Sequence, residues 1–258
     1  MNKSLLFLSI LLIPGYLFSQ EEQSARTTHL FSLEIVNNQV KENILIPKVN
    51  RGPGIELSYR FEKDKKNLNE LMFAAGYSKL KTNLETDKGT YNISFNADYS
   101  WGKILLDGEK VKYYLGADVS YNWSVLEYPV WDESRAYWSS AISAGLYNRI
   151  KLIFNDKNTL ISSLKMELAG ICSRPEDIRL YAQEEWTFSN IILITNSGYT
   201  FTTIPDFFLC SLRNEYRIAL NEDLCFSLNN SIIYSTISEI NGESFQRIII
   251  SFGIGVGF

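Results

Sequence analysis

Apolar and polar residues alternate with a period of two along most of the chain after Thr27. Such alternation gives a β-strand two different faces. The clearest segment runs from Tyr91 to Trp101, where apolar or aromatic side chains occupy every odd position. The segment from Val111 to Val125 repeats the pattern. No segment shows the spacing of an amphipathic helix, so the sequence predicts an all-β fold.

The alternating segments are long, and turn-forming residues such as Asp107-Gly108 and Asn241-Gly242 separate them. Strands of soluble domains usually have about five or six residues, whereas a transmembrane β-strand needs about 9 to 11. The pattern predicts an antiparallel, up-and-down transmembrane β-barrel of about 12 strands, in a range of about 10 to 14. The expected strands are approximately 28–36, 54–62, 69–79, 90–101, 111–125, 136–150, 159–173, 178–188, 191–201, 207–220, 224–237 and 244–258.

Aromatic spacing distinguishes a barrel in lipid from a soluble β-sandwich, in which large rings can lie anywhere on the apolar face. Tyr113 and Trp123 are ten residues apart, as are Tyr91 and Trp101. At about 3.3 Å per residue and a tilt near 40°, this interval spans roughly 25 Å, the separation of the two aromatic girdles of an outer-membrane barrel. The expected lipid-interface aromatics are Tyr91, Tyr99, Trp101, Tyr113, Tyr121 and Trp123.

The first 19 residues have the pattern of a secretory signal peptide. Lys3 precedes an apolar run that Pro14-Gly15 interrupts, and Ser19 offers a small residue at the expected cleavage site. The run from Leu5 to Phe18 is shorter than the roughly 20 residues of a spanning helix. We therefore expect residues 1–19 to be removed on export, and residues 20–258 to form a single barrel domain.

The C-terminal segment alternates to its last residue through Ile248, Ile250, Phe252, Ile254, Val256 and Phe258. It resembles the assembly signal of Gram-negative outer-membrane β-barrel proteins, with Phe252, Ile254, Val256 and Phe258 in the signal positions. The signal peptide, which ends in Phe-Ser-Gln, is similar to those of the Bacteroidota. This resemblance implies an outer-membrane location, insertion by the barrel assembly machinery, periplasmic termini and an even number of strands. Outer loops are then expected near 37–53, 80–89, 126–135, 174–177, 202–206 and 238–243.

If the apolar positions face lipid, the alternate polar positions line the lumen. Two interpretations stay open: a water-filled pore whose charges select solutes, or an interior packed by paired charges. Arg213, Glu215 and Arg217 form the densest cluster and are the candidate constriction. The expected lumen-lining charges are Glu34, Glu56, Arg60, Asp98, Lys112, Asp118, Arg149, Lys165, Glu167, Arg213, Glu215, Arg217 and Arg247.

Three functions follow from these patterns. The leading one is a narrow pore or transport component for small polar solutes, and the alternative is a non-conducting structural or partner-binding barrel of an envelope complex. The third is a barrel hydrolase acting on lipid. The sole histidine, His29, falls near the expected periplasmic rim, so no catalytic residue is assigned, although a pair such as Asp98 and Asp118 leaves carboxylate chemistry open.

Composition excludes other classes of function. With 25 basic and 29 acidic residues, the chain has a net charge of −4 and no concentrated basic segment, which excludes a nucleic-acid partner. Cys172, Cys210 and Cys225 do not have metal-ligand spacing, and we expect small apolar filler rather than disulfides. No metal or cofactor is expected, and the expected partners are membrane lipid and the assembly machinery.

Overall fold

The computed structural model describes residues 26–42, 49–82, 89–128, 135–174, 188–204, 206–238 and 244–258. The expected signal peptide at 1–19 lies outside these residues. The described part contains the strands β1 (Arg26–Glu42), β2 (Val49–Asp64), β3 (Asn67–Leu80), β4 (Thr90–Asp107), β5 (Val111–Tyr128), β6 (Arg135–Ile153), β7 (Asn158–Ser173), β8 (Thr200–Thr203), β9 (Phe207–Ala219), β10 (Cys225–Ser238) and β11 (Ser244–Gly257), and the helix α2 (Phe188–Thr195).

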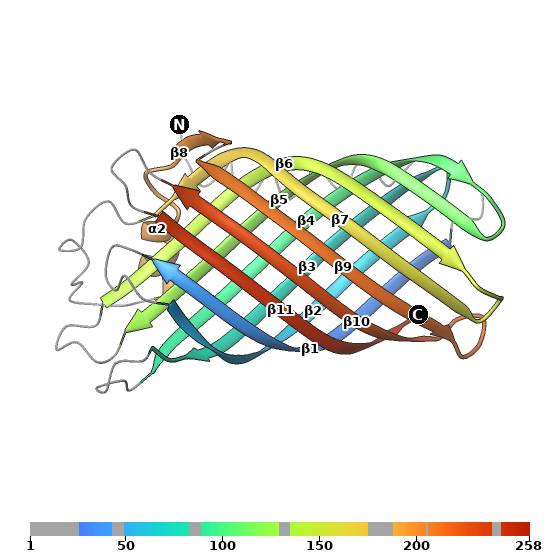
Figure 1. Cartoon of the computed structure of the whole chain (residues 1–258), viewed down its shortest axis with the longest axis horizontal. Helices are drawn as coiled ribbons and strands as arrows, with labels where there is room; N and C mark the ends of the chain where they lie inside the picture. Colours follow the sequence, from blue (N-terminus) through green and yellow to red (C-terminus); the bar gives the residue numbers. More distant parts are fainter. Residues whose placement is uncertain are drawn as a thin grey trace.

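The strands form a closed antiparallel barrel (Figure 1). Each strand pairs with its neighbour in the sequence, except that β7 pairs with β9 along most of its length. Pairing of β1 with β11, from Leu30↔Gly257 to Glu42↔Phe245, closes the wall. The predicted all-β barrel of antiparallel strands is therefore confirmed.

The barrel has two different ends. Short turns at 65–66, 108–110, 154–157 and 220–224 join strands at the end that also holds Phe258, and we call it the turn end. The opposite end holds α2, β8 and the remaining connections, and we call it the loop end. Figure 1 shows the turn end at the right and the loop end at the left.

The wall has ten strands rather than about 12. β8 pairs only with β7, over Ala169–Cys172, and lies outside the closed wall. The expected strand at 191–201 is instead the end of α2, a turn and the start of β8, and the expected strand at 178–188 lies almost wholly outside the described residues. The error has a physical cause: Ile191 to Ile194 is a continuous apolar run, which fits a helix as well as a strand.

Several strands also extend into segments that the sequence assigned to loops. β1 and β2 stay paired as far as Lys41↔Val49, inside the expected loop at 37–53. β5 and β6 likewise stay paired through Tyr128↔Arg135 across the expected loop at 126–135. The wall therefore extends further at the loop end than the segments with alternating apolar residues indicated.

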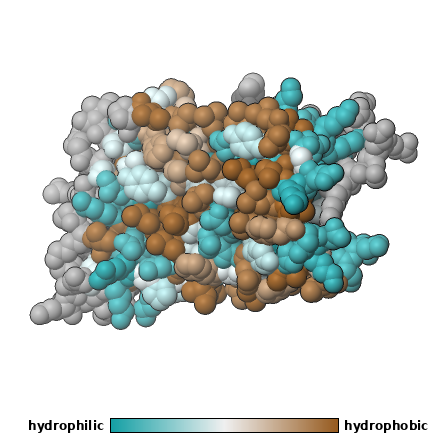
Figure 2. Space-filling model, turned by 45° about the vertical axis from the view of Figure 1, so that its right-hand side comes forward, coloured by the Kyte–Doolittle hydropathy of each residue, from teal (hydrophilic) through white to brown (hydrophobic). Residues whose placement is uncertain are grey.

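Along most of the wall, apolar side chains point outward and polar ones point inward. On β1, Phe31, Leu33 and Ile35 are 52%, 48% and 69% exposed, whereas Ser32 and Glu34 are buried. Figure 2 shows apolar side chains over much of the middle of the wall and hydrophilic ones towards its ends. No helix in the described ranges is long and apolar enough to cross a membrane.

Near the loop end the pattern inverts. On β1 the outward positions become Asn37, Gln39 and Lys41, while Val36 and Val40 are buried inside. β11 changes in the same way, with Gln246 exposed and Phe245 buried. The loop end thus has the polar-outside, apolar-inside character of a soluble barrel. Its buried core, the loop-end core, is formed by Val40, Leu80, Leu126, Tyr137, Ala141, Cys172, Phe207, Leu209, Ile237 and Phe245.

Candidate functional site

The inward charges nearest the turn end form one network, which we call the ionic layer. It comprises Arg60 and Glu62 of β2, Glu70 of β3, Arg149 of β6, and Glu215 and Arg217 of β9. Arg149 donates to Glu62 Oε1 at 2.5 Å and to Glu70 Oε2 at 2.8 Å. Arg60 bonds to Glu215, and Arg217 bonds to both Glu62 and Glu215.

The ionic layer spans the lumen rather than one side of it. β6 and β9 each lie four strands away from β2 along a ten-stranded wall, in opposite directions. The pairs Arg149–Glu62 and Arg60–Glu215 therefore connect walls on different sides of the interior. Arg60, Arg149 and Glu215 are 2%, 1% and 1% exposed, so these three side chains leave almost no surface to solvent.

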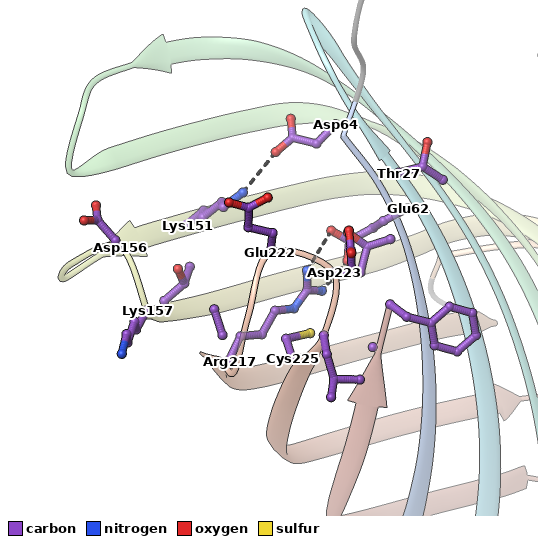
Figure 3. Close-up of a pocket in the computed structure, with 16 residues that line it drawn as sticks. Thr27, Glu62, Asp64, Lys151, Asp156, Lys157, Arg217, Glu222, Asp223 and Cys225 are labelled. Atoms are coloured by element: carbon purple, nitrogen blue, oxygen red, sulfur yellow. Dashed lines mark hydrogen bonds and ion pairs between the residues drawn. The ribbon is translucent and has the colours of Figure 1, made fainter.

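A vestibule opens on the turn-end side of this layer (Figure 3). Its volume is about 330 Å³, and Glu62 and Arg217, which hydrogen-bond to each other, belong to its lining. Lys151 donates to Asp64 at 3.1 Å on the vestibule wall, and Tyr114 donates to the same carboxylate at 2.8 Å. Carboxylates outnumber cations in the lining, with Glu62, Asp64, Asp156, Glu222 and Asp223 against Lys151, Lys157 and Arg217.

Above the ionic layer, the middle of the lumen is filled by polar contacts between distant strands. Arg213 of β9 donates to Glu34 Oε1 at 2.8 Å and to the sulfur of Met72 on β3, the strand diametrically opposite. Lys165 lies 3.5 Å from Asp98. Two cavities lined by described residues, one in this layer and one between it and the loop-end core, each have a volume of about 50 Å³, which is room for only a few water molecules.

Further polar contacts complete the middle layer. Arg247 donates to the side-chain oxygens of Asn38 and Asn92 at 3.2 and 3.0 Å, and Ser143 bonds to Glu167. Asp118 is 2% exposed, and its carboxylate oxygens accept no hydrogen bond from the part of the chain that the structure describes. No group of three or more potential metal ligands occurs within those described ranges.

The loop-end core forms the last layer of the interior. Tyr137 of β6 and Phe245 of β11, four strands apart on the wall, stack at 5.6 Å with an interplanar angle of 14°. Since these rings face each other from different sides of the barrel, they occupy the lumen itself. The interior therefore consists of an ionic layer, a polar layer and an apolar layer in series.

The charged residues predicted to line the lumen take different places in these layers. Arg60, Arg149, Glu215 and Arg217 belong to the ionic layer. Lys112 lies at the turn-end rim, 3.0 Å from the exposed Asp107. The remaining residues of the prediction face the middle layer, and they are Glu34, Glu56, Asp98, Asp118, Lys165, Glu167, Arg213 and Arg247.

Sequence reasoning missed two carboxylates of the ionic layer. Glu62 ends the expected strand at 54–62 and Glu70 lies in the expected strand at 69–79, but neither was singled out as a lumen-lining charge. Like Arg60, both residues have even numbers on the hairpin of β2 and β3, and therefore lie on the same inward face. The register pairs Glu62 directly with Glu70. Continuing the alternation of β2 by one more inward position would have found Glu62.

His29 lies in an aromatic cluster at the turn end. Its Nδ1 is 2.8 Å from the hydroxyl of Tyr59, and its ring packs edge-on against Phe61 and stacks with Phe258. Backbone hydrogen bonds between His29 and Phe258 join the first strand to the end of the chain. The packing of this histidine thus serves closure of the barrel seam.

The cysteines carry no disulfide. Cys172, Cys210 and Cys225 are present as thiols, with no disulfide among them. Cys172 belongs to the loop-end core, and Cys210 and Cys225 are partly buried.

α2 and β8 form an arm on the outside of the wall near the loop end. Trp123 donates to Thr195 at 2.8 Å, Tyr121 donates to Asn196 at 2.9 Å, and Ser173 donates to the backbone of Ser197. Two of the expected interface aromatics therefore hold this arm. Its outward surface includes Ile192, Leu193, Phe201 and Ile204, which are all exposed.

Tyr199 also fixes the arm to the wall. Its hydroxyl donates to Asn196 at 2.6 Å and lies 2.9 Å from Ser140 of β6. Burial raises the pKa of Tyr199 to about 12, which moves deprotonation of this donor still further above neutral pH.

The exposed apolar residues around the wall form a band that we call the apolar belt. The other expected interface aromatics point outward towards the two ends of this belt. Tyr99 donates to Asn69 and Tyr113 donates to Asn148, at 2.8 and 2.6 Å. Trp101 is exposed, and Tyr91 stacks with Tyr77. The C-terminal residues Phe252, Ile254, Val256 and Phe258 are exposed on the outward face of β11 beside the seam with β1.

The barrel is similar in fold to solved outer-membrane proteins. The outer membrane protease OmpT from Escherichia coli matches with a TM-score of 0.56 at 10% identity, over 92% of this chain and 99% of that chain. The translocator domain of the autotransporter NalP from Neisseria meningitidis matches with a TM-score of 0.43 at 8% identity, over 98% and 94% of the two chains. The β domain of the Bordetella autotransporter BrkA gives 0.44 at 10% identity, over 90% and 99%.

No protein-family model matches the chain, and no curated protein matches its sequence. At 10% identity, the likeness to OmpT concerns the fold alone, and the two autotransporter matches carry no further argument. The predicted resemblance to Gram-negative outer-membrane β-barrels is confirmed at that level. The similarity to Bacteroidota signal peptides stays a prediction.

Proposed function

We propose that this chain is a non-conducting outer-membrane barrel whose loop end serves as a binding or structural element of the cell envelope. The turn end would lie in the periplasm and the loop end outside the membrane. Of the three functions that the sequence suggested, this is the second. The observation that carries it is the ionic layer, whose buried pairs connect opposite walls of the lumen.

The ionic layer opposes opening because a solute would have to separate buried charges. Removing one member of a buried ion pair leaves its partner uncompensated at a cost of about 3–5 kcal/mol. Glu62 alone contacts Arg60, Arg149 and Arg217, so a passage at this level breaks several pairs at once. A solute that passed this layer would then meet the apolar loop-end core, where Tyr137 and Phe245 face each other.

The inversion of the apolar pattern supports a protruding loop end. Outward positions such as Asn37, Gln39 and Lys41 suit water, and the buried core beneath them stabilises the wall without lipid. Apolar outward positions such as Leu33 and Ile35 suit hydrocarbon. A rigid platform beyond the membrane, with the arm of α2 and β8 at its side, is the surface that we propose for contacts with other envelope components.

A hydrolase is less well supported. The chain has one histidine, and His29 packs among Tyr59, Phe61 and Phe258 at the turn end. Asp98, which the sequence suggested as a catalytic carboxylate together with Asp118, lies beside Lys165 in the filled middle of the lumen. Neither arrangement presents a base to an open cavity.

Cysteine accessibility tests the closed lumen position by position. In a variant whose three native cysteines are replaced, Ser120→Cys places a thiol in the middle layer, where Ser120 is 1% exposed. Thr159→Cys places one in the vestibule as a matched control. A small polar methanethiosulfonate should modify the vestibule thiol and spare the middle one until the protein is unfolded in urea. Equal labelling of both positions in the folded barrel would contradict the proposal.

Two further expectations belong to this proposal. Export should remove residues 1–19, so the mature protein should begin at Gln20, which N-terminal sequencing would show. A membrane-impermeant maleimide should label Gln39→Cys on intact cells but not Leu33→Cys, because the first position lies above the apolar belt and the second lies within it.

A further inference from the structure

Two amides interrupt the apolar outward face of β9 and β10. Between Phe226 and Tyr234 the outward positions of β10 are Phe226, Leu228, Asn230, Ile232 and Tyr234, so Asn230 is the central one of this stretch. On β9, Asn214 lies between the outward residues Tyr216 and Leu212 and is the direct cross-strand partner of Asn230. β9 and β10 run side by side on the near wall of the barrel in Figure 1.

The two amides bond to each other but are not saturated. Asn214 donates from Nδ2 to Oδ1 of Asn230 at 3.0 Å, on the exposed side of the wall. An amide side chain has two N–H donors and an oxygen that accepts two bonds. Asn230 thus keeps two donors, and Asn214 keeps its oxygen and one donor. Exchanging the oxygen and nitrogen atoms of either amide would still leave the pair with unused donors and unused acceptors.

Three other outward amides of the wall have a different setting. Asn69, Asn148 and Asn158 each accept a hydrogen bond from a tyrosine, namely Tyr99, Tyr113 and Tyr216. Those pairs lie towards the turn end, where tyrosines gather at the edge of the belt and water is near. The Asn214–Asn230 pair lies instead in the middle of the belt, among Leu212, Leu228, Ile232 and Phe252, all exposed.

In hydrocarbon, unsatisfied polar groups are costly, and amide side chains there commonly hydrogen-bond to a neighbouring protein segment. We propose that the face formed by β9 and β10 packs against the same face of a second copy of this chain, with the amide pairs hydrogen-bonded to each other across the interface. The second copy is the favoured occupant because the patch is self-complementary.

The self-complementarity follows from symmetry. A two-fold axis along the membrane normal presents a face to its own copy with left and right exchanged, so that Asn214 of one copy faces Asn230 of the other. The free oxygen of Asn214 then meets the free N–H groups of Asn230, twice per dimer. The flanking leucine and isoleucine side chains supply an apolar surround that excludes lipid headgroups and water.

Dimerisation in a bilayer tests this inference. The mature chain, with its native cysteines replaced and Asp156→Cys labelled with donor or acceptor dye, is placed in phosphatidylcholine vesicles and diluted with lipid. Energy transfer should fall with dilution along a monomer–dimer curve. The variant Asn214→Leu/Asn230→Leu should weaken association by about tenfold, since interchain amide hydrogen bonds are lost. The matched control Asn69→Leu, on β3, should leave association unchanged.

Three results would overturn the inference: no concentration-dependent transfer in the wild type, unchanged association in the double variant, or equal weakening in the control. Heat-modifiable migration on a gel confirms that each variant is folded, and a hydrophobic replacement at an outward position should not prevent insertion. The inference uses the proposed membrane location but not the closed lumen. If the chain does not insert into vesicles, both the proposed membrane location and the dimer are contradicted. If it inserts but stays monomeric, only the dimer is contradicted.

Discussion

Arg149 on β6 and Glu62 on β2 meet inside the barrel, with Nη2 and Oε1 2.5 Å apart, although four strands separate them along the wall. Both side chains are almost completely buried. The contact joins residues 87 positions apart in the chain and crosses the space that would have to be open in a pore. The proposed closure of the lumen depends on contacts of this kind.

Removing Arg149 should destabilise the barrel strongly. Arg149→Ala leaves Glu62 and Glu70 without their shared partner in a buried setting, and we expect a loss of about 3–5 kcal/mol in the free energy of unfolding. Lys112→Ala, which removes the partner of the exposed Asp107, should cost no more than about 1 kcal/mol. Urea unfolding in lipid vesicles measures both, and equal losses would show that the ionic layer does not stabilise the fold.

The loop-end core should behave like the core of a soluble barrel. Phe245→Ala removes a buried ring that stacks on Tyr137, so we expect a loss of about 3–5 kcal/mol. Gln246→Ala, at the adjacent exposed position, should change stability by no more than about 0.5 kcal/mol. Proteolysis at the loop end should rise in the first variant only; equal resistance of the two variants would contradict a packed core there.

The terminal ring should be needed for barrel closure and assembly. Phe258 stacks on His29 at 5.7 Å and on Phe31 at 6.0 Å, and its backbone bonds to that of His29. Phe258→Ser should lower the heat-modifiable fraction of the protein in the membrane, because aromatic contacts of about 1 kcal/mol each are lost. Phe258→Tyr retains the ring and should restore that fraction. Full assembly of the serine variant would rule out an assembly role for this residue.

The arm should loosen when its anchor is removed. Thr195 is 2% exposed and accepts the indole N–H of Trp123 at 2.8 Å. Thr195→Val should cost about 1 kcal/mol locally and speed amide hydrogen exchange in α2. Thr200→Val, at an exposed threonine of the same arm, is the matched control. Unchanged exchange in α2 would mean that this hydrogen bond does not hold the arm to the wall.

The fold was predictable where neighbouring positions see opposite environments. Tyr91 to Trp101 alternates because odd positions face outward and even ones face the lumen, and β4 follows this prediction as far as Lys103, before its register shifts between Ile104 and Leu106. The same reasoning gave the wrong element for Ile191 to Ile194, because a short apolar run without polar positions shows no periodicity that distinguishes a helix from a strand. It also ended β1 too early, because the apolar face changes sides between Ile35 and Val36.

The sequence predicted which charged side chains point into the interior, but not which of them contact each other. Alternation places Arg60 and Glu215 on the inside of their strands, yet no local pattern says that a residue of β2 meets one of β9. That contact depends on the number of strands, which sets how far apart the two walls are. With about 12 strands expected, an open pore and a packed interior remained equally compatible with the sequence; ten strands let the long arginine side chains reach across.

Single-channel conductance of the mature protein in a planar bilayer tests the closed lumen most directly. With insertion confirmed by heat-modifiable gel mobility, we expect no current through the wild type at any applied voltage that the membrane tolerates. Discrete current steps, with ion selectivity altered by Arg213→Ala/Arg217→Ala, would contradict the closed lumen and establish a narrow pore through these layers.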